Sequence, residues 1–319
     1  MSKVPPSSRS SAWLVAAMLG MVVLPAGLTL YHVHVTALAP VLAPHASPYG
    51  YTVSLLLFIV PIVVIGGWFI PHEGVRISRK SFWWTIGLLF PLGAGLDFFF
   101  AQYFFVFPNA EATLGIKAPA LGTPVPIEEY IFSLTGFLAM LLLYIWLDEY
   151  WLAAYSIPDS AAGRLQFKRL LTFHPESVAL AVGLVAGAIV YKKYFSPFPE
   201  GFPGYFVFLA LAALVPSAAL LPTVRLLINW RAFSLVAFFM LLVSLLWEVT
   251  LALPYGWWNF RDRQMLGLRI TAWSWLPIEE VCLWISVTYA TVIVYEVVKC
   301  WQASGKPMLH AFMGAPSPK

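Results

Sequence analysis

The feature that most constrains this chain is a series of long apolar segments that contain few charged residues. A helix that crosses a bilayer needs roughly 20 consecutive, largely apolar residues. Such segments lie near residues 12–30, 51–70, 82–106, 124–147, 177–194, 202–221, 232–254 and 276–298. Only 11% of all residues are charged and 60% are hydrophobic, whereas a soluble domain carries roughly 25% charged residues. We therefore predict an all-α polytopic membrane bundle of about eight transmembrane helices.

Positive charges are distributed unevenly over the predicted loops. With the N-terminus inside, 13 Lys and Arg residues fall on the inner side and six on the outer side. Cytoplasmic loops carry such an excess, so we expect an integral membrane protein with both termini cytoplasmic. Segment 12–30 has an alternative interpretation, because Ala37-Leu38-Ala39 resembles a signal cleavage site. Pro40 follows that tripeptide and the apolar run is long for a signal, so we favour a retained helix. Cleavage would leave seven spans.

Several common kinds of site have no signal in this sequence. The net charge of +4 comes without a Lys/Arg-rich stripe, so we expect no nucleic-acid partner. Cys282 and Cys300 lack metal-ligand spacing, and neither a dinucleotide fingerprint nor a P-loop occurs. We therefore expect no cofactor and no metal ion.

One four-residue motif occurs twice. Residues 126–129 and 277–280 both read Pro-Ile-Glu-Glu, and each motif opens a predicted span. A lone acid in the preceding span, Asp97 or Glu248, lies 31 residues before the first motif glutamate in both copies. Two further pairs match in spacing: Leu-Gly-Ile-Lys at 114–117 with Leu-Gly-Leu-Arg at 266–269, and Tyr144 with Tyr295. These matches indicate an internal repeat.

The repeat is predicted to be parallel. An even number of spans separates the two motifs, so both open on the same face of the membrane. Parallel repeats are related by a pseudo-two-fold axis along the membrane normal. We predict two four-helix repeats, residues 1–165 with motif 126–129 and residues 166–319 with motif 277–280.

The acids of the repeat are candidates for chemistry. Proline and acids in a first turn are also the ordinary signal of a helix N-terminus. Here the helix enters a membrane, where an ionised carboxylate costs roughly 2.5–3.5 kcal/mol at mid-span, and the pair occurs twice. We therefore favour function for the motif glutamates. For the lone acids, a polar contact between helices stays an open alternative. The six candidate catalytic residues are Asp97, Glu128, Glu129, Glu248, Glu279 and Glu280.

The two glutamates of each motif are expected to have different roles. Adjacent residues on a helix point about 100° apart, so the two glutamates face different surroundings and cannot have the same role. A carboxyl group that keeps its proton in an apolar site can act as a general acid, and its neighbour as a base.

Aromatic residues gather around these acids. They follow Asp97, flank Glu248 and precede the second motif: Phe98, Phe99, Phe100, Tyr103, Phe104, Phe105, Trp247, Tyr255, Trp257, Trp258, Trp273 and Trp275. For most of them we favour an interfacial belt. The alternative is a pocket whose ring faces attract a developing carbocation.

The duplicated motif in this context resembles the lycopene cyclases of the fused or heterodimeric membrane type. The resemblance covers residues 82–147 and 232–298. The matching residues are 126–129 and 277–280, and in the second half also 247–248, 255–258 and 295–296.

The resemblance implies an enzyme, an intramolecular lyase or isomerase of the lycopene β-cyclase type. Its substrate would be a carotenoid from the lipid bilayer, lycopene or a similar compound, whose acyclic ψ-ends become β-ionone rings (β- or γ-carotene) without net redox change or flavin. A carboxylic acid protonates the terminal C1–C2 double bond at C2, the C5–C6 double bond closes the ring, and a carboxylate removes the C6 proton. We expect Glu128 and Glu279 to be the principal groups, with Glu129, Glu280, Glu248 and Asp97 supporting them.

Alternatives stay open at this stage. Halves in that family commonly have fewer spans than the four predicted here, which leaves room for a C50 carotenoid substrate or for hydration of the cation. A proton-coupled transporter is the alternative of another class, and a carotenoid-binding protein without chemistry is a third. A transporter would need acids near mid-membrane and helices broken at equivalent positions, whereas Pro91 and Pro216 are not equivalent. The sequence does not determine the working half, the acid and the base within each pair, whether one or both ends react, or the oligomeric state.

Overall fold

Seven helices of the computed structural model are long and apolar enough to cross a membrane, among the residues that it describes (47–72, 77–157 and 167–314). They are Gly50–His72, Arg79–Phe104, Ile127–Trp151, Pro175–Tyr194, Gly204–Val224, Trp230–Ala252 and Ile278–Ser304. These helices correspond to the second through eighth predicted spans, and the all-α membrane bundle is confirmed. The predicted span 12–30 and the predicted repeat boundary at residue 165 lie outside the described residues.

The first of these helices is irregular. It comprises α2 (Gly50–Ser54), α3 (Leu56–Val64), a π-helical turn (Ile65–Phe69) and α4 (Ile70–His72). Pro61 lies inside α3, and a proline removes one backbone hydrogen bond from a helix. A wider turn that follows such a break keeps the remaining backbone groups paired inside the membrane.

The other helices run as longer single elements. They are α5 (Arg79–Phe104), α6 (Ile127–Trp146), α8 (Pro175–Tyr194), α9 (Gly204–Val224), α10 (Trp230–Trp247) and α11 (Ile278–Ser304). A short helix, α12 (Met308–Met313), follows α11. π-helical turns continue α6 (Leu147–Trp151) and α10 (Glu248–Ala252), and 3-10 turns cover Ala110–Ala112, Ala153–Tyr155 and Asp262–Gln264.

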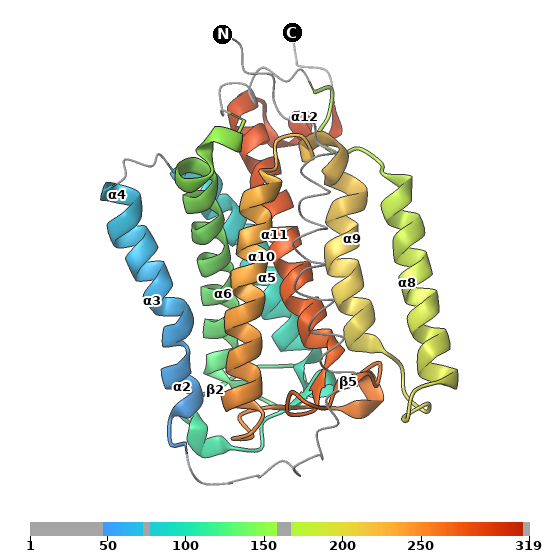
Figure 1. The fold of residues 1–319 in the computed structure, drawn as a ribbon. Helices are drawn as coiled ribbons and strands as arrows, with labels where there is room; N and C mark the ends of the chain where they lie inside the picture. Colours follow the sequence, from blue (N-terminus) through green and yellow to red (C-terminus); the bar gives the residue numbers. More distant parts are fainter. Residues whose placement is uncertain (1–46, 73–76, 158–166, 315–319) are drawn as a thin grey trace.

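Three pairs of two-residue antiparallel strands lie at one end of the bundle, opposite α12 (Figure 1). The pairs are β2 (Lys117–Ala118) with β3 (Val125–Pro126), β5 (Arg269–Ile270) with β6 (Leu276–Pro277), and β1 (Phe105–Val106) with β4 (Asn259–Phe260). The first two pairs are hairpins that lead directly into α6 and α11. The third pair lies in the segments that follow α5 and α10, and it joins the first half of the chain (residues up to 157) to the second half (from residue 167).

α11 is the central helix of the bundle. It packs against α5, α6, α9 and α10, and α6 packs in turn against α3, α5 and α10, while α3 and α8 lie at opposite edges (Figure 1). The two helices that the motifs open are thus the ones most enclosed by protein.

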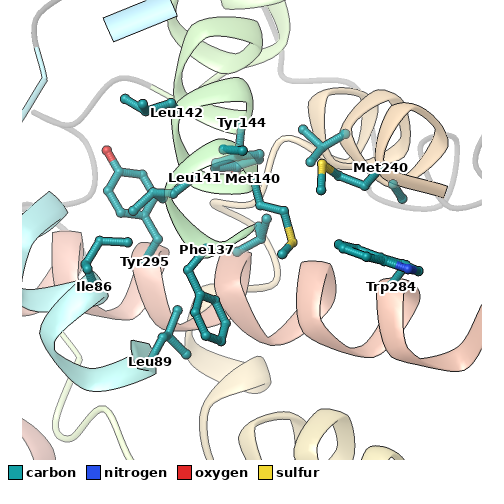
Figure 2. Packing of buried hydrophobic residues seen from close by; sticks show 14 of the residues in the cluster. Ile86, Leu89, Phe137, Met140, Leu141, Leu142, Tyr144, Met240, Trp284 and Tyr295 are labelled. Carbon is teal, nitrogen blue, oxygen red and sulfur yellow. The ribbon is translucent and has the colours of Figure 1, made fainter. Parts of the chain in front are cut away.

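Buried side chains fill the space between α5, α6, α10 and α11 (Figure 2). Thr288 on α11 donates a hydrogen bond to the Met140 sulfur on α6 at 3.3 Å. The Tyr144 and Tyr295 rings, whose spacing matched in the repeat, meet edge to face with centroids 6.1 Å apart.

The outer surface of the bundle is apolar. Val63 on α3, Leu92 on α5, Val182 on α8 and Val215 on α9 are each at least 60% exposed. Apolar surface of this extent marks contact with a membrane rather than with water. The protein is therefore membrane-embedded.

Candidate active site

Each motif begins its helix directly after a hairpin. Pro126 and Pro277 end β3 and β6 and precede the first helical residues of α6 and α11. The backbone N–H groups of those first residues, Ile127 and Ile278, donate to carbonyl oxygens of Ile116 and Leu268 in the hairpins, both at 3.0 Å. Proline has no N–H to leave unpaired and fits a helix start. Both motifs therefore enter the bundle in the same way.

The first glutamate of each motif fastens the hairpin to the helix. Glu128 accepts a hydrogen bond from the Leu114 N–H at 2.7 Å and another from the Thr52 hydroxyl at 2.6 Å. Glu279 accepts the corresponding bond from the Leu266 N–H. Both carboxyl groups are fully buried. The positive charges of Arg269 and Lys192 also act on Glu279.

The second glutamate of the first motif faces the lone acid. The Tyr51 hydroxyl of α2 donates to Glu129 at 2.7 Å. Asp97 on α5 lies close enough to Glu129 for the two carboxyl groups to interact, and it accepts a hydrogen bond from Ser133 at 3.0 Å. Asp97 and Glu129 are 4% and 8% exposed. Two acids thus share one buried site in the first half.

The second half repeats this arrangement with different side chains. Tyr205 on α9 forms a side-chain hydrogen bond with Glu280, and Glu280 interacts with Glu248 at the end of α10. The indole N–H of Trp284 donates to Glu248 at 3.0 Å. Trp284 occupies the position of Ser133, four residues after the second glutamate.

The structure therefore places the six predicted residues in two groups of three. We call Asp97, Glu128 and Glu129 the first acid cluster, and Glu248, Glu279 and Glu280 the second acid cluster. In each cluster, the lone acid pairs with the second glutamate, whereas the first glutamate is held by the hairpin.

Four carboxyl oxygens of these clusters receive no hydrogen bond from an N–H group or a hydroxyl group among the described residues. They are Oε2 of Glu128, Oε2 of Glu248, Oε2 of Glu279 and Oε1 of Glu280. Buried carboxyl oxygens are nearly always hydrogen-bonded, and an unpaired one needs a functional explanation. Glu248 and Glu280 hydrogen-bond to each other, which requires a proton on one of the two carboxyl groups, and the free oxygens of Glu128 and Glu279 can each take a proton.

A group of contacting aromatic rings joins the two clusters. This aromatic wall consists of Tyr51, Phe58, Phe132, Trp247, Trp258 and Trp284. Phe58 stacks on Trp284 with centroids 5.9 Å apart, and Trp247 lies 4.9 Å from Trp258. Through Tyr51 the wall reaches the first cluster, and through Trp284 the second.

The expectation of an interfacial belt is wrong for part of the aromatic set. Phe98, Phe99, Phe100 and Tyr103 are exposed on α5, but the Trp247, Trp257 and Trp258 side chains are buried. The reason is that α10 and the loop after it pack against α2, so that Trp257 stacks on Tyr51 at 6.1 Å.

The sequence did not point to Tyr51, Tyr205, Ser133 or Trp284. A signal for the tyrosines was present, because Gly50-Tyr51 and Gly204-Tyr205 both open the helix that follows the first predicted span of each half. Ser133 and Trp284 differ in type, so only the structure shows that each donates a hydrogen bond to the lone acid of its half.

Within the described ranges, no group of three or more His, Cys, Asp or Glu side chains is arranged to hold a metal ion. The site is a set of carboxyl, hydroxyl and indole groups in an apolar enclosure, which suits the transfer of protons to and from an apolar molecule.

Comparison with known proteins gives one match. A family model described as lycopene cyclase matches residues 48–147 and 178–298, which include both motifs and both lone acids. No curated protein and no solved structure matches the chain.

Proposed function

This chain belongs to the lycopene cyclase family, and from that premise we propose that it converts the ψ-ends of lycopene to β-ionone rings without net redox change. The observation that carries the proposal is the pairing, in each half, of a lone acid with the second motif glutamate. Both pairs are buried inside the bundle and lie beside the aromatic wall.

The pair supplies both catalytic groups that the reaction needs. One carboxylic acid gives its proton to C2 of the end group, which leaves positive charge on C1. The π electrons of the C5–C6 double bond form the C1–C6 bond, so that the charge moves to C5. The other member of the pair, as a carboxylate, takes the proton from C6, and the C5–C6 double bond re-forms. One proton is added and one is removed, so the mass is unchanged.

The contact between the two acids closes the cycle. After one ring has formed, the former acid lacks a proton and the former base carries one. Because Asp97 interacts with Glu129 and Glu248 with Glu280, the proton can return within the pair. A site this deeply buried needs no water for the return, and the exclusion of water favours proton loss over hydration of the cation.

The aromatic wall stabilises the cationic intermediates. The face of a Trp, Tyr or Phe ring attracts a cation, with Trp the strongest, and the attraction exceeds about 2 kcal/mol when both partners are desolvated. Trp247 is 2% exposed, so its attraction for a cation would not be weakened by water.

The setting in the bilayer fits an apolar substrate. The outer surface of the bundle is apolar, so a carotenoid dissolved in lipid can reach the protein without passing through water. The charge bias of the loops supports cytoplasmic termini, which would place the hairpins and both motifs at the outer face.

Bacteria engineered to accumulate lycopene provide the test. Cells that express the wild-type chain should form cyclic carotenoid of unchanged mass. The double variant Glu129→Gln/Glu280→Gln should lose at least about a hundredfold of this activity, since general acid–base catalysis contributes at least that much. Glu111→Gln changes an exposed acid whose backbone carbonyl accepts a hydrogen bond from the Tyr49 N–H, directly before α2; it is the matched control and should behave as wild type.

Two results would contradict the proposal. Untouched lycopene in cells with well-inserted wild-type protein would exclude this substrate. A product heavier by one water would show hydration instead of proton loss.

A further inference from the structure

The two acid clusters contain the same set of groups: a lone acid that interacts with the second motif glutamate, a first glutamate, and hydrogen-bond donors to all three. Each has a tyrosine on the second glutamate and a donor, Ser133 or Trp284, on the lone acid. Each also has a first glutamate that is bonded to a hairpin N–H. Neither cluster lacks a member of the set.

Each cluster is also built within its own half. Asp97, Glu129, Tyr51 and Ser133 all belong to residues up to 157, and the corresponding contacts of Glu280 involve only residues from 167 onward. Among the described residues, the carboxyl groups of each cluster interact with one another and not with those of the other cluster. Each cluster can therefore complete a proton cycle without the other.

An idle second cluster would be costly. Each ionised carboxyl group near hydrocarbon costs up to about 3 kcal/mol, and the second cluster alone buries three carboxyl groups. A cluster that served only to hold helices together would be more stable with paired or apolar side chains.

We infer that both acid clusters are working centres, and that each closes one ring on a polyene with two identical acyclic ends. This inference rests on the proposed function and extends it: the chain holds two centres, each able to form a C1–C6 bond by adding a proton at C2 and removing one from C6. The aromatic wall, which touches both clusters, is shared between them.

The test compares single and double variants of purified protein in detergent with lycopene. Glu129→Gln and Glu280→Gln should each retain about half of the wild-type rate of ring formation, because independent sites contribute additively. Both should accumulate more one-ring product at early times. In the double variant, the rate of ring formation should fall at least about a hundredfold. Asp97→Asn should have the same effect as Glu129→Gln, and Glu248→Gln the same effect as Glu280→Gln. Size-exclusion profiles would show that all variants are folded.

Other patterns would overturn the inference. If one single variant lost all ring formation while the other kept the wild-type rate, only one centre would work. If both single variants lost all ring formation while folded, the clusters would act as one site. Failure of the proposed function looks different, because then the wild type forms no ring or the double variant still does.

Discussion

A tyrosine hydroxyl holds the second motif glutamate in each half. The Tyr51 hydroxyl donates to Glu129 at 2.7 Å, and Tyr205 bonds to Glu280 in the same way. A hydrogen bond to a charged group contributes about 1.5–3 kcal/mol. Tyr51→Phe combined with Tyr205→Phe should therefore slow ring formation by about tenfold or more, measured as the initial rate of product formation.

Tyr130→Phe is the control for these changes. Its hydroxyl donates to the Pro119 carbonyl at the bundle surface, so it should keep the wild-type rate. An unchanged rate in the Tyr51→Phe/Tyr205→Phe variant would show that the tyrosines do not position the glutamates.

The aromatic wall has its own test at the level of one ring. At Trp247 the rate should fall in the order Trp, Phe, Leu, because cation–π attraction weakens from Trp to Phe and is absent in Leu. A loss of about 2 kcal/mol would make Trp247→Leu roughly 30-fold slower. Trp301→Phe at the opposite end should have no effect on the rate. Equal rates for Phe and Leu at 247 would contradict a role for the ring face.

Most of the site could be predicted at the residue level, because the acids stand out in apolar sequence. Repeated spacing led to all six carboxyl groups. It did not reveal that the lone acids pair with Glu129 and Glu280, since the direction of a side chain around a helix depends on its neighbours. Nor could spacing indicate Tyr51, which reaches Glu129 across 78 residues of sequence.

At the level of elements, the hairpins before α6 and α11 position the first glutamates. The segment that enters each hairpin contains a glycine with positive φ two residues before the first strand, Gly115 at 76° before β2 and Gly267 at 96° before β5. A Cβ on Gly267 would collide with the Ser196 hydroxyl and approach Pro197 at 3.3 Å, whereas Gly115 has open space around it.

Alanine at these two glycines should therefore have unequal effects. Gly115→Ala bears only the backbone strain of a left-handed conformation, about 1–2 kcal/mol. Gly267→Ala adds steric overlap worth about 1–3 kcal/mol and should move the Leu266 N–H away from Glu279. Thermal unfolding in detergent should show the larger loss of stability for Gly267→Ala. Equal losses would mean that the hairpin relaxes freely.

The elements themselves followed well from hydropathy. Seven predicted spans match helices of the structure because a run of apolar residues inside a bilayer has to pair its backbone groups within a helix. The π-helical turn that begins at Glu248 was not predictable, since a single inserted residue leaves no mark on hydropathy.

At the scale of the molecule, the arrangement predicts which end is outside. Glu111 bonds through its backbone to Tyr49 at the start of α2, Met308 opens α12 at the other end of the bundle (Figure 1), and both residues are exposed. With cytoplasmic termini, a membrane-impermeant maleimide applied to intact cells should label Glu111→Cys and not Met308→Cys. The native Cys282 is half-buried and Cys300 buried, so the unchanged chain serves as background. Labelling of Met308→Cys alone would show the opposite orientation, with the α12 end outside.

The burial of the tryptophans is also a property of the whole molecule. Sequence alone could not separate a belt from a wall, because Trp suits both places. Which of the two applies depends on how α2, α6, α10 and α11 meet, and this contact joins residues from both halves. The division into repeats at residue 165 stays a prediction.

In the proposed reaction, a carboxyl group of the protein gives a proton to C2, the ring closes, and a different proton is lost from C6. Its most direct test is a single turnover of lycopene by protein equilibrated in heavy water, with mass analysis of the product. We expect one deuterium per ring formed, located at C2, and at least about a hundredfold less of this labelled product from the Glu129→Gln/Glu280→Gln protein. Cyclic product without deuterium would show that the ring closes without protonation by the protein, and would contradict the account.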